Sequence, residues 1–154
     1  MTDHADAELV TMTAGGAHFG VPVMRVRDVL DTPTIYPVPL APPEILGSIN
    51  LRGRIVTAID LRRRLGLAPR PPSSRCVCVI VERAQDAAGE PYALLVDDIG
   101  EVLTLSAQRY EPNPVTLSKD WSQLCRGLYR QEHALLLVLD IDSVLAIPAL
   151  ARAA

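Results

Sequence analysis

Short hydrophobic runs with a two-residue period occupy the beginning of the chain. Apolar and polar positions alternate over 8–13 and again over 17–21, and Gly15-Gly16 lies between them. This pattern predicts a β-hairpin with a two-residue glycine turn. From 22 to 30 the apolar residues recur at spacings of three and four, which fits a short helical turn or a twisted edge segment.

The stretch 44–67 carries the strongest pattern. Two apolar runs flank a polar turn at 50–54, and the second run, 55–59, is β-branched and nearly continuous. A run of this kind predicts a strand buried on both faces. Asp60 is the expected N-cap of a helix over 61–65, and Gly66 can adopt the positive φ that ends a helix.

The second half of the chain is rich in strand patterns. Strands are expected over 75–83, 91–97, 99–105, 124–130 and 134–140. We expect a helical turn over 106–109, a loop over 110–120, and a helix over 143–147 that ends at Pro148. The segment 50–61 with its helix is faintly similar to 127–141 with its helix, which indicates an internal repeat.

Proline marks two segments outside the regular elements. Five prolines fall within 32–43, a density that favours an edge strand or an extended surface segment. A polyproline ligand for SH3-type modules is the functional alternative, but PxxP spacing alone is a weak signal. The second segment, 68–74, is predicted to be the crossing between two lobes.

Together these elements predict an all-β protein with short helices, in which each half closes a small barrel with one helix at its mouth. Short strands without long connecting helices favour barrels over layered α/β folds. The 154 residues form one domain. We expect lobe one to cover about 14–80, and lobe two about 81–147 together with the N-terminal strand.

Composition excludes some function classes and suggests a location. Aromatic residues make up 4% of the chain, which disfavours stacking platforms for single-stranded nucleic acid. Residues 25–75 contain nine arginines and four carboxylates, so this part is basic while the remainder is acidic. That asymmetry fits either an acidic partner or ordinary solvated faces. No run reaches the ~20 apolar residues of a spanning helix, so we expect a cytoplasmic protein.

Candidate catalytic and metal sites are weak. The three histidines are scattered, and the three cysteines lack the spacing of a zinc site, so we expect reduced, buried thiols and neither metal nor cofactor. Asp97 and Asp98 are adjacent, and neighbouring strand residues point to opposite faces. The run 62–64 is triply basic, but one helical turn spreads these arginines around its axis. Trp121 is either an interface anchor or a cover for a barrel end.

Three blocks of sequence resemble a known family. The matching residues are Gly47, Ile49, Asn50, Leu51, Arg52, Gly53, Ile55, Val56, Ile59, Asp60 and Leu61, followed by 94–103 and preceded by 19–21 with 26–29. In order and spacing they resemble the CheW family, the coupling proteins of bacterial chemotaxis, and the related regulatory domain of the chemotaxis histidine kinase. The resemblance covers about 8–147, with Thr57 where the family usually has proline. It implies an all-β fold of two SH3-like, five-stranded β-barrel lobes packed together.

The resemblance implies a non-enzymatic adaptor with two partners. These would be the helical hairpin at the cytoplasmic tip of a chemoreceptor and the regulatory domain of the histidine kinase, in receptor arrays at the inner membrane. It places Val26 and Asp28 at partner contacts and Arg52 at a characteristic turn. We hypothesise an Asp28–Arg52 ion pair beside an apolar groove at the lobe junction. The residues expected to line the groove are Val26, Val29, Ile99 and Val102, although burial in an ordinary core is the competing interpretation.

Two other functions stay open at this point. The first is a module of the same fold that binds a kinase but no receptor and serves another pathway. The second is a small-molecule-binding or hydrolytic barrel, which would need a pocket with converging polar groups. No direct contact with nucleic acid or with the membrane is expected.

Overall fold

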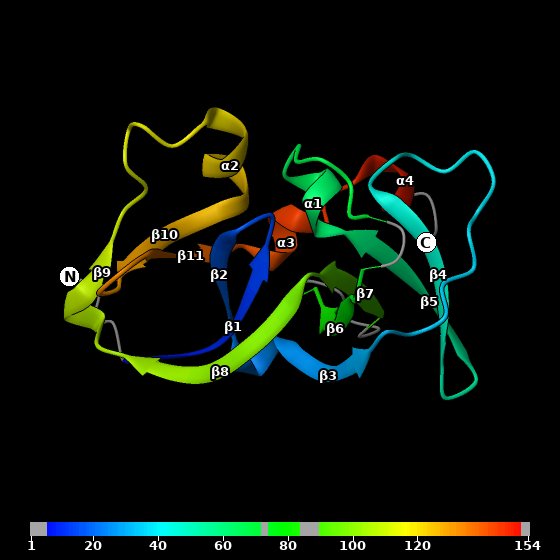
Figure 1. The fold of residues 1–154 in the computed structure, drawn as a ribbon, viewed down its shortest axis with the longest axis horizontal. Helices are drawn as coiled ribbons and strands as arrows, with labels where there is room; N and C mark the ends of the chain where they lie inside the picture. The colour runs from blue at the N-terminus through cyan, green and yellow to red at the C-terminus, as the bar shows by residue number, and fades with distance from the viewer. Residues whose placement is uncertain (1–5, 72–73, 84–89, 152–154) are drawn as a thin grey trace.

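Residues 6–71, 74–83 and 90–151 are described by the computed structural model, and their strands form two sheets towards opposite ends of the molecule (Figure 1). One sheet has the strand order β8-β1-β2-β11-β10-β9. Its strands are β1 (Ala7–Ala14), β2 (Ala17–Pro22), β8 (Asp98–Leu105), β9 (Tyr110–Glu111), β10 (Cys125–Arg130) and β11 (Leu135–Leu139). We call this part the six-stranded lobe.

The second sheet has the order β3-β6-β7-β5-β4 and is called the five-stranded lobe. Its strands are β3 (Val26–Asp31), β4 (Ile45–Leu51), β5 (Arg54–Asp60), β6 (Val77–Glu82) and β7 (Pro91–Val96). The helical segments are η1 (Val23–Arg25), α1 (Leu61–Arg64), η2 (Ala107–Arg109), α2 (Lys119–Leu124), α3 (Ile141–Val144) and α4 (Pro148–Ala151). The predicted class, all-β with short helices in two lobes, is confirmed; the two-residue β9 gives one lobe its sixth strand.

The strands are divided between the lobes differently from the predicted boundaries. β2 belongs with β1, because the Gly15-Gly16 hairpin pairs them antiparallel from Leu9 opposite Pro22 to Ala14 opposite Ala17. β7 belongs with β6, which it pairs along its whole length. The chain therefore crosses between lobes at η1 and again at Asp97, and the predicted crossing at 68–74 is wrong because α1 and β6 lie in the same lobe.

Both lobes repeat one topology. Each contains two antiparallel groups of strands joined by one parallel pair, β2 with β11 and β5 with β7. β5 and β11 each continue into a helix that begins at an aspartate. The Asp60 side chain accepts the backbone N–H of Arg62 at 3.0 Å, and the Asp140 side chain accepts that of Ser143 at 3.4 Å. The internal repeat expected from the sequence is therefore present in the fold.

A shared hydrophobic core fills the space between the two sheets. Its residues come from both lobes and include Met12, Phe19, Ile59 and Leu94, all almost fully buried. Smaller apolar clusters lie inside each lobe. β6 contacts both kinds of core in strict alternation, because Val77, Val79 and Val81 enter the shared core while Cys78 and Ile80 enter the inner cluster.

Three local predictions are corrected by the structure. Ile55 is 70% exposed, since the parallel partner strand β7 covers β5 only from Thr57 onward. The predicted loop over 110–120 contains β9 and the start of α2, whose N-cap Ser118 accepts the backbone N–H of Trp121. Pro148 does not end the helical region but begins α4, where a missing N–H costs nothing.

Candidate functional site: an edge-strand surface across both lobes

Two edge strands form the surface that carries most of the residues predicted to bind partners. β3 is the outer strand of the five-stranded lobe, and β8 is the outer strand of the six-stranded lobe. Both run along the same border of the molecule (Figure 1). We call β3 and β8 together the edge-strand surface. Because each has only one neighbour in its sheet, both leave backbone groups unpaired at their outer side.

The four predicted groove residues divide into an inner and an outer pair. Val26 and Ile99 are half-buried and pack against the shared core. Val29 is 38% and Val102 is 54% exposed, so both present apolar area to solvent. At the lobe junction the apolar faces of the two sheets pack on each other as the shared core, and Val26 and Ile99 take part in this packing. That the four residues line a groove for a partner stays a prediction.

The hypothesised ion pair between Asp28 and Arg52 is present. An Arg52 guanidinium nitrogen lies 2.9 Å from a carboxylate oxygen of Asp28, and the other Asp28 oxygen accepts the backbone N–H of Val29. Arg52 occupies the β4–β5 turn with φ of 53°, followed by Gly53 with φ of 86°. These positive angles are those of a tight hairpin turn. Because the Arg52 side chain is 82% exposed, the pair contributes only ~0–1 kcal/mol to stability.

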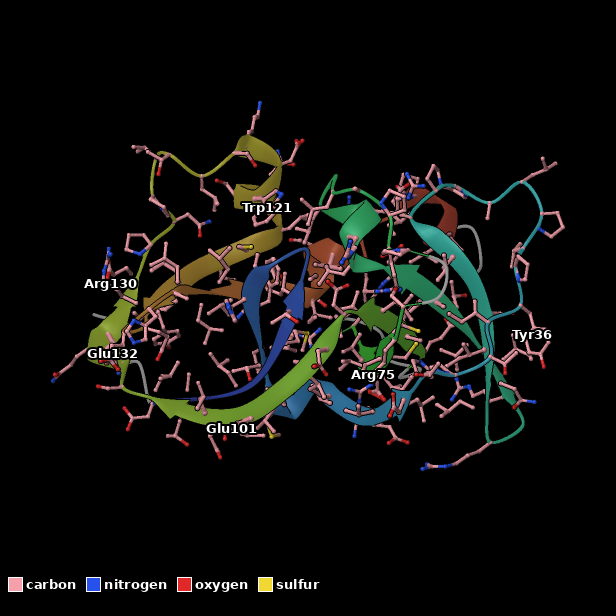
Figure 2. All side chains as sticks on the ribbon, viewed as in Figure 1. Tyr36, Arg75, Glu101, Trp121, Arg130 and Glu132 are labelled. Atoms are coloured by element: carbon pink, nitrogen blue, oxygen red, sulfur yellow. The ribbon has the colours of Figure 1, made fainter. Side chains whose placement is uncertain are left out.

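Arg75 connects the two edge strands and was not predicted. Its guanidinium lies 3.1 Å from Asp31 at the end of β3 and 3.5 Å from Asp98 at the start of β8. The hydrogen bond from Arg75 lowers the pKa of Asp31. Figure 2 shows Arg75 near the place where the two strands meet. No local sequence signal identifies this bridge, since its partners lie 44 and 23 residues away.

Asp97 joins the lobes at the second crossing of the chain. Arg62 donates two hydrogen bonds to its carboxylate at 2.8 and 2.7 Å, and the Gly15 N–H of the other lobe donates at 2.9 Å. Burial raises the pKa of Asp97, but the hydrogen bonds and the charge of Arg62 outweigh that effect and lower it. Asp98 faces Arg75 instead, so the two adjacent carboxylates have separate partners, as the strand geometry predicted.

Further polar contacts hold the lobes in one arrangement. The Trp121 indole N–H of the six-stranded lobe donates to the Leu65 carbonyl at 2.9 Å, just after α1. In return, Arg64 from α1 donates to the Ser143 and Val144 carbonyls at 2.9 Å. Arg62 and Arg64 thus point to different partners, in agreement with the prediction that one helical turn spreads these arginines around its axis. Trp121 also packs on the ring of Phe19 and so lies over the lobe junction (Figure 2), while its predicted role as an interface anchor stays a prediction.

Comparison with known proteins identifies the family. The model of the CheW-like domain matches residues 8–148. The chain belongs to the CheW-like domain family. It is 31% identical over 137 residues to the chemotaxis protein CheW of Rhizobium meliloti, covering 89% of this chain and 86% of that protein. It is 29% identical over 142 residues to the probable chemotaxis protein CheW of Rhizobium etli, covering 92% and 89%.

A solved structure supports the same assignment. The crystal structure of the scaffolding protein TtCheW from Thermoanaerobacter tengcongensis superposes with a TM-score of 0.80 at 25% sequence identity. The match covers 92% of this chain and 94% of that one. CheW-like proteins are scaffolding adaptors of chemotaxis signalling and not enzymes, so the functional features of this domain are its surfaces.

The cysteines of this CheW-like domain belong to its buried interior. Cys76, Cys78 and Cys125 are buried free thiols, and burial raises the pKa of Cys78 and of Cys125 to about 12. Among the described residues, no group of three or more His, Cys, Asp or Glu side chains is arranged to hold a metal ion. No helix within those residues has the length and apolar character needed to cross a membrane.

Proposed function

We propose that this CheW-like domain couples the cytoplasmic tips of chemoreceptors to a chemotaxis histidine kinase by binding both. The observation that carries the proposal is that two edge strands from different lobes each expose a valine, Val29 on β3 and Val102 on β8. We call these two side chains the apolar strip. An amphipathic receptor helix laid along these strands would contact both lobes and cover this strip. The proposed location is the cytoplasm, at receptor arrays of the inner membrane, without a cofactor.

The charged residues beside the strip support a directional contact. The Asp28–Arg52 pair borders Val29, and Arg75 with its two carboxylates lies where the strands meet. Charges at the rim of an interface add little affinity but set orientation and association rate. We assign Val26 and Ile99 to the support of this surface, since both pack against the shared core.

A separate surface is proposed for the kinase regulatory domain. β4 is the other edge strand of the five-stranded lobe. In addition to its pairing with β5, it forms an isolated bridge from Ser48 to Tyr36. Beside it, Ile55 is 70% and Tyr36 is 57% exposed. A related barrel on the kinase could pair with this edge while covering both side chains.

Two aspartate substitutions test the assignment of partners to surfaces. Val102→Asp should abolish retention of a purified receptor-tip hairpin in a pull-down, because it places a charge in the apolar strip. Val115→Asp is the matched control, since Val115 is fully exposed in the loop between β9 and α2. Ile55→Asp should weaken binding of the kinase regulatory domain and leave receptor binding intact. Circular dichroism checks that each variant is folded.

The outcomes separate the competing functions. Receptor binding that is unaffected in folded Val102→Asp removes the edge-strand surface from the receptor contact, and unfolding of that variant would assign Val102 to the core. Unaltered binding of both partners by Arg52→Glu removes Arg52 from the interfaces. A wild-type protein that retains the kinase domain but no receptor hairpin would be the kinase-only module.

A further inference from the structure

A cavity of about 340 Å³ lies in the five-stranded lobe, and no residue of the edge-strand surface lines it. Its apolar wall comes from the proline-rich segment and two strands, represented by Ile35, Leu46 and Leu95. Its polar wall contains Asp60, Arg70 and Cys76. Apolar walls with a few converging polar groups, at this size, are typical of sites for small molecules.

Arg70 is the unusual group in this wall. Its side chain is nine-tenths buried, and its Nε–H has no hydrogen-bond partner. Its one ion pair, to Asp97, is long at 3.3 Å and leaves that donor unused. A buried donor without an acceptor is costly, and guanidinium groups in proteins are normally well satisfied. The buried Nε–H of Arg70 therefore lacks a hydrogen-bond acceptor.

The charges around the cavity favour a monoanion. Arg63 also lines it, and within the described residues Arg63 forms no ion pair or side-chain hydrogen bond. Arg62, Arg63 and Arg70 together outnumber the two carboxylates of Asp60 and Asp97 by one. Because Asp60 is almost fully buried in the same wall, a doubly charged phosphate would be repelled more than a carboxylate.

We propose that this cavity binds a small organic acid, with the carboxylate accepting hydrogen bonds from Arg70 and the apolar body resting on Ile35, Leu46 and Leu95. The site is separate from the edge-strand surface, and its Leu46 belongs to β4. Its contact with Arg70 reaches Asp97, the residue where the chain crosses between lobes.

Methyl NMR on the full chain tests the site with two probes of the same shape, 4-methylpentanoate and the neutral 4-methylpentanamide. The acid should shift the methyl signals of Ile35, Leu46 and Leu95 saturably, and the amide should bind about tenfold more weakly or worse. Arg70→Gln should lower the affinity for the acid to that for the amide. Arg70→Lys should bind the acid with an affinity between those of the wild type and of Arg70→Gln. Arg54→Gln, on the exposed end of β5, is the matched control and should change nothing.

Three results would overturn the site: no saturable shift with the acid, equal affinity for acid and amide, or unchanged acid affinity in Arg70→Gln. If Arg70→Gln fails to fold, the comparison of acid with amide on the wild-type chain decides alone. Receptor and kinase binding do not enter this titration, so its failure leaves the proposed adaptor function untouched, and the reverse also holds.

Discussion

At the scale of single residues, the Asp97 side chain receives hydrogen bonds from both lobes. It lies directly between β7 and β8, where the chain leaves one sheet for the other. Its carboxylate receives hydrogen bonds from α1 of one lobe and from the hairpin of the other. A hydrogen bond to a charged group contributes ~1.5–3 kcal/mol, so this one side chain affects the relative placement of both sheets.

Replacing Asp97 with Asn should destabilise the protein by about 2 kcal/mol at pH 7, since the charged acceptor of Arg62 is lost. The folded-state pKa of Asp97 lies below its usual 3.8. Its contribution to stability is therefore complete above about pH 4 and disappears as the pH falls through the folded value. Urea unfolding of wild type and variant at pH 7 and near pH 3 measures the difference.

Asp31→Asn is the matched control for that experiment. Asp31 also pairs with an arginine and has a lowered pKa, but its side chain is largely exposed. Its replacement should change the urea midpoint less than Asp97→Asn does at pH 7. Equal effects of the two substitutions, or a gap between wild type and Asp97→Asn that widens in acid, would contradict the role given to Asp97.

Contacts of single residues were predictable from the sequence when the partners lie close together along the chain. Asp60 as N-cap and Gly66 after the helix were predictable because the signals lie within one helical turn. The Asp28–Arg52 pair was reached only through family resemblance, since 24 residues separate the partners. Arg75 with Asp31 and Arg62 with Asp97 had no signal, because their approach depends on how the sheets assemble.

At the scale of elements, the proline-rich segment 32–43 lies over the edge strand β4. Tyr36 and Ser48 exchange two backbone hydrogen bonds of 2.8 Å. This close approach requires glycine at 47, because a Cβ there would collide with the Tyr36 carbonyl. The segment therefore covers part of an edge that would otherwise be open to pairing with other chains.

Gly47→Ala should break this bridge and destabilise the protein by about 2 kcal/mol, the combined contribution of two hydrogen bonds. Gly53→Ala is the control: it also has positive φ but open space around it, so about 1 kcal/mol is expected. Thermal unfolding followed by circular dichroism compares them. A smaller effect at Gly47 than at Gly53 would show that the segment is not fixed by this contact.

The sequence predicted the strands whose hydrophobic pattern is strong, namely β1, β2, β6 and the β4–β5 hairpin. α2 and β9 were missed because 110–120 contains two prolines and no apolar period, while their positions depend on contacts with β10. The hydrophobic pattern also could not predict that Ile55 is exposed. A β-branched run does not reveal how far the neighbouring strand extends.

At the scale of the whole molecule, both lobes depend on one shared core. The sequence predicted two lobes but assigned β2 and β7 to the wrong ones. Each belongs with its hairpin partner, β1 or β6, and the hydrophobic pattern does not show in which sheet a hairpin lies. The sequence prediction placed a groove at the junction, where the two sheets pack on each other in the shared core. Two sheets with apolar faces bury more area by packing on each other than by leaving a channel.

The shared core predicts one cooperative unfolding transition. The single tryptophan, Trp121, contacts Phe19 of the six-stranded lobe and donates to Leu65 beside the five-stranded lobe. Its fluorescence and the far-ultraviolet circular dichroism should therefore give the same urea midpoint. Separate midpoints, with Trp121 changing first, would mean that the lobes part before either unfolds.

The central claim is that β3 and β8 together receive the receptor. Hydrogen–deuterium exchange of this chain with and without a receptor-tip hairpin tests it most directly, because outward amides of edge strands exchange rapidly until they are covered. We predict slower exchange in Val26–Asp31 and Asp98–Leu105, and none of this slowing in the loop that carries Val115. Protection confined to other strands, while these two exchange as before, would contradict the claim.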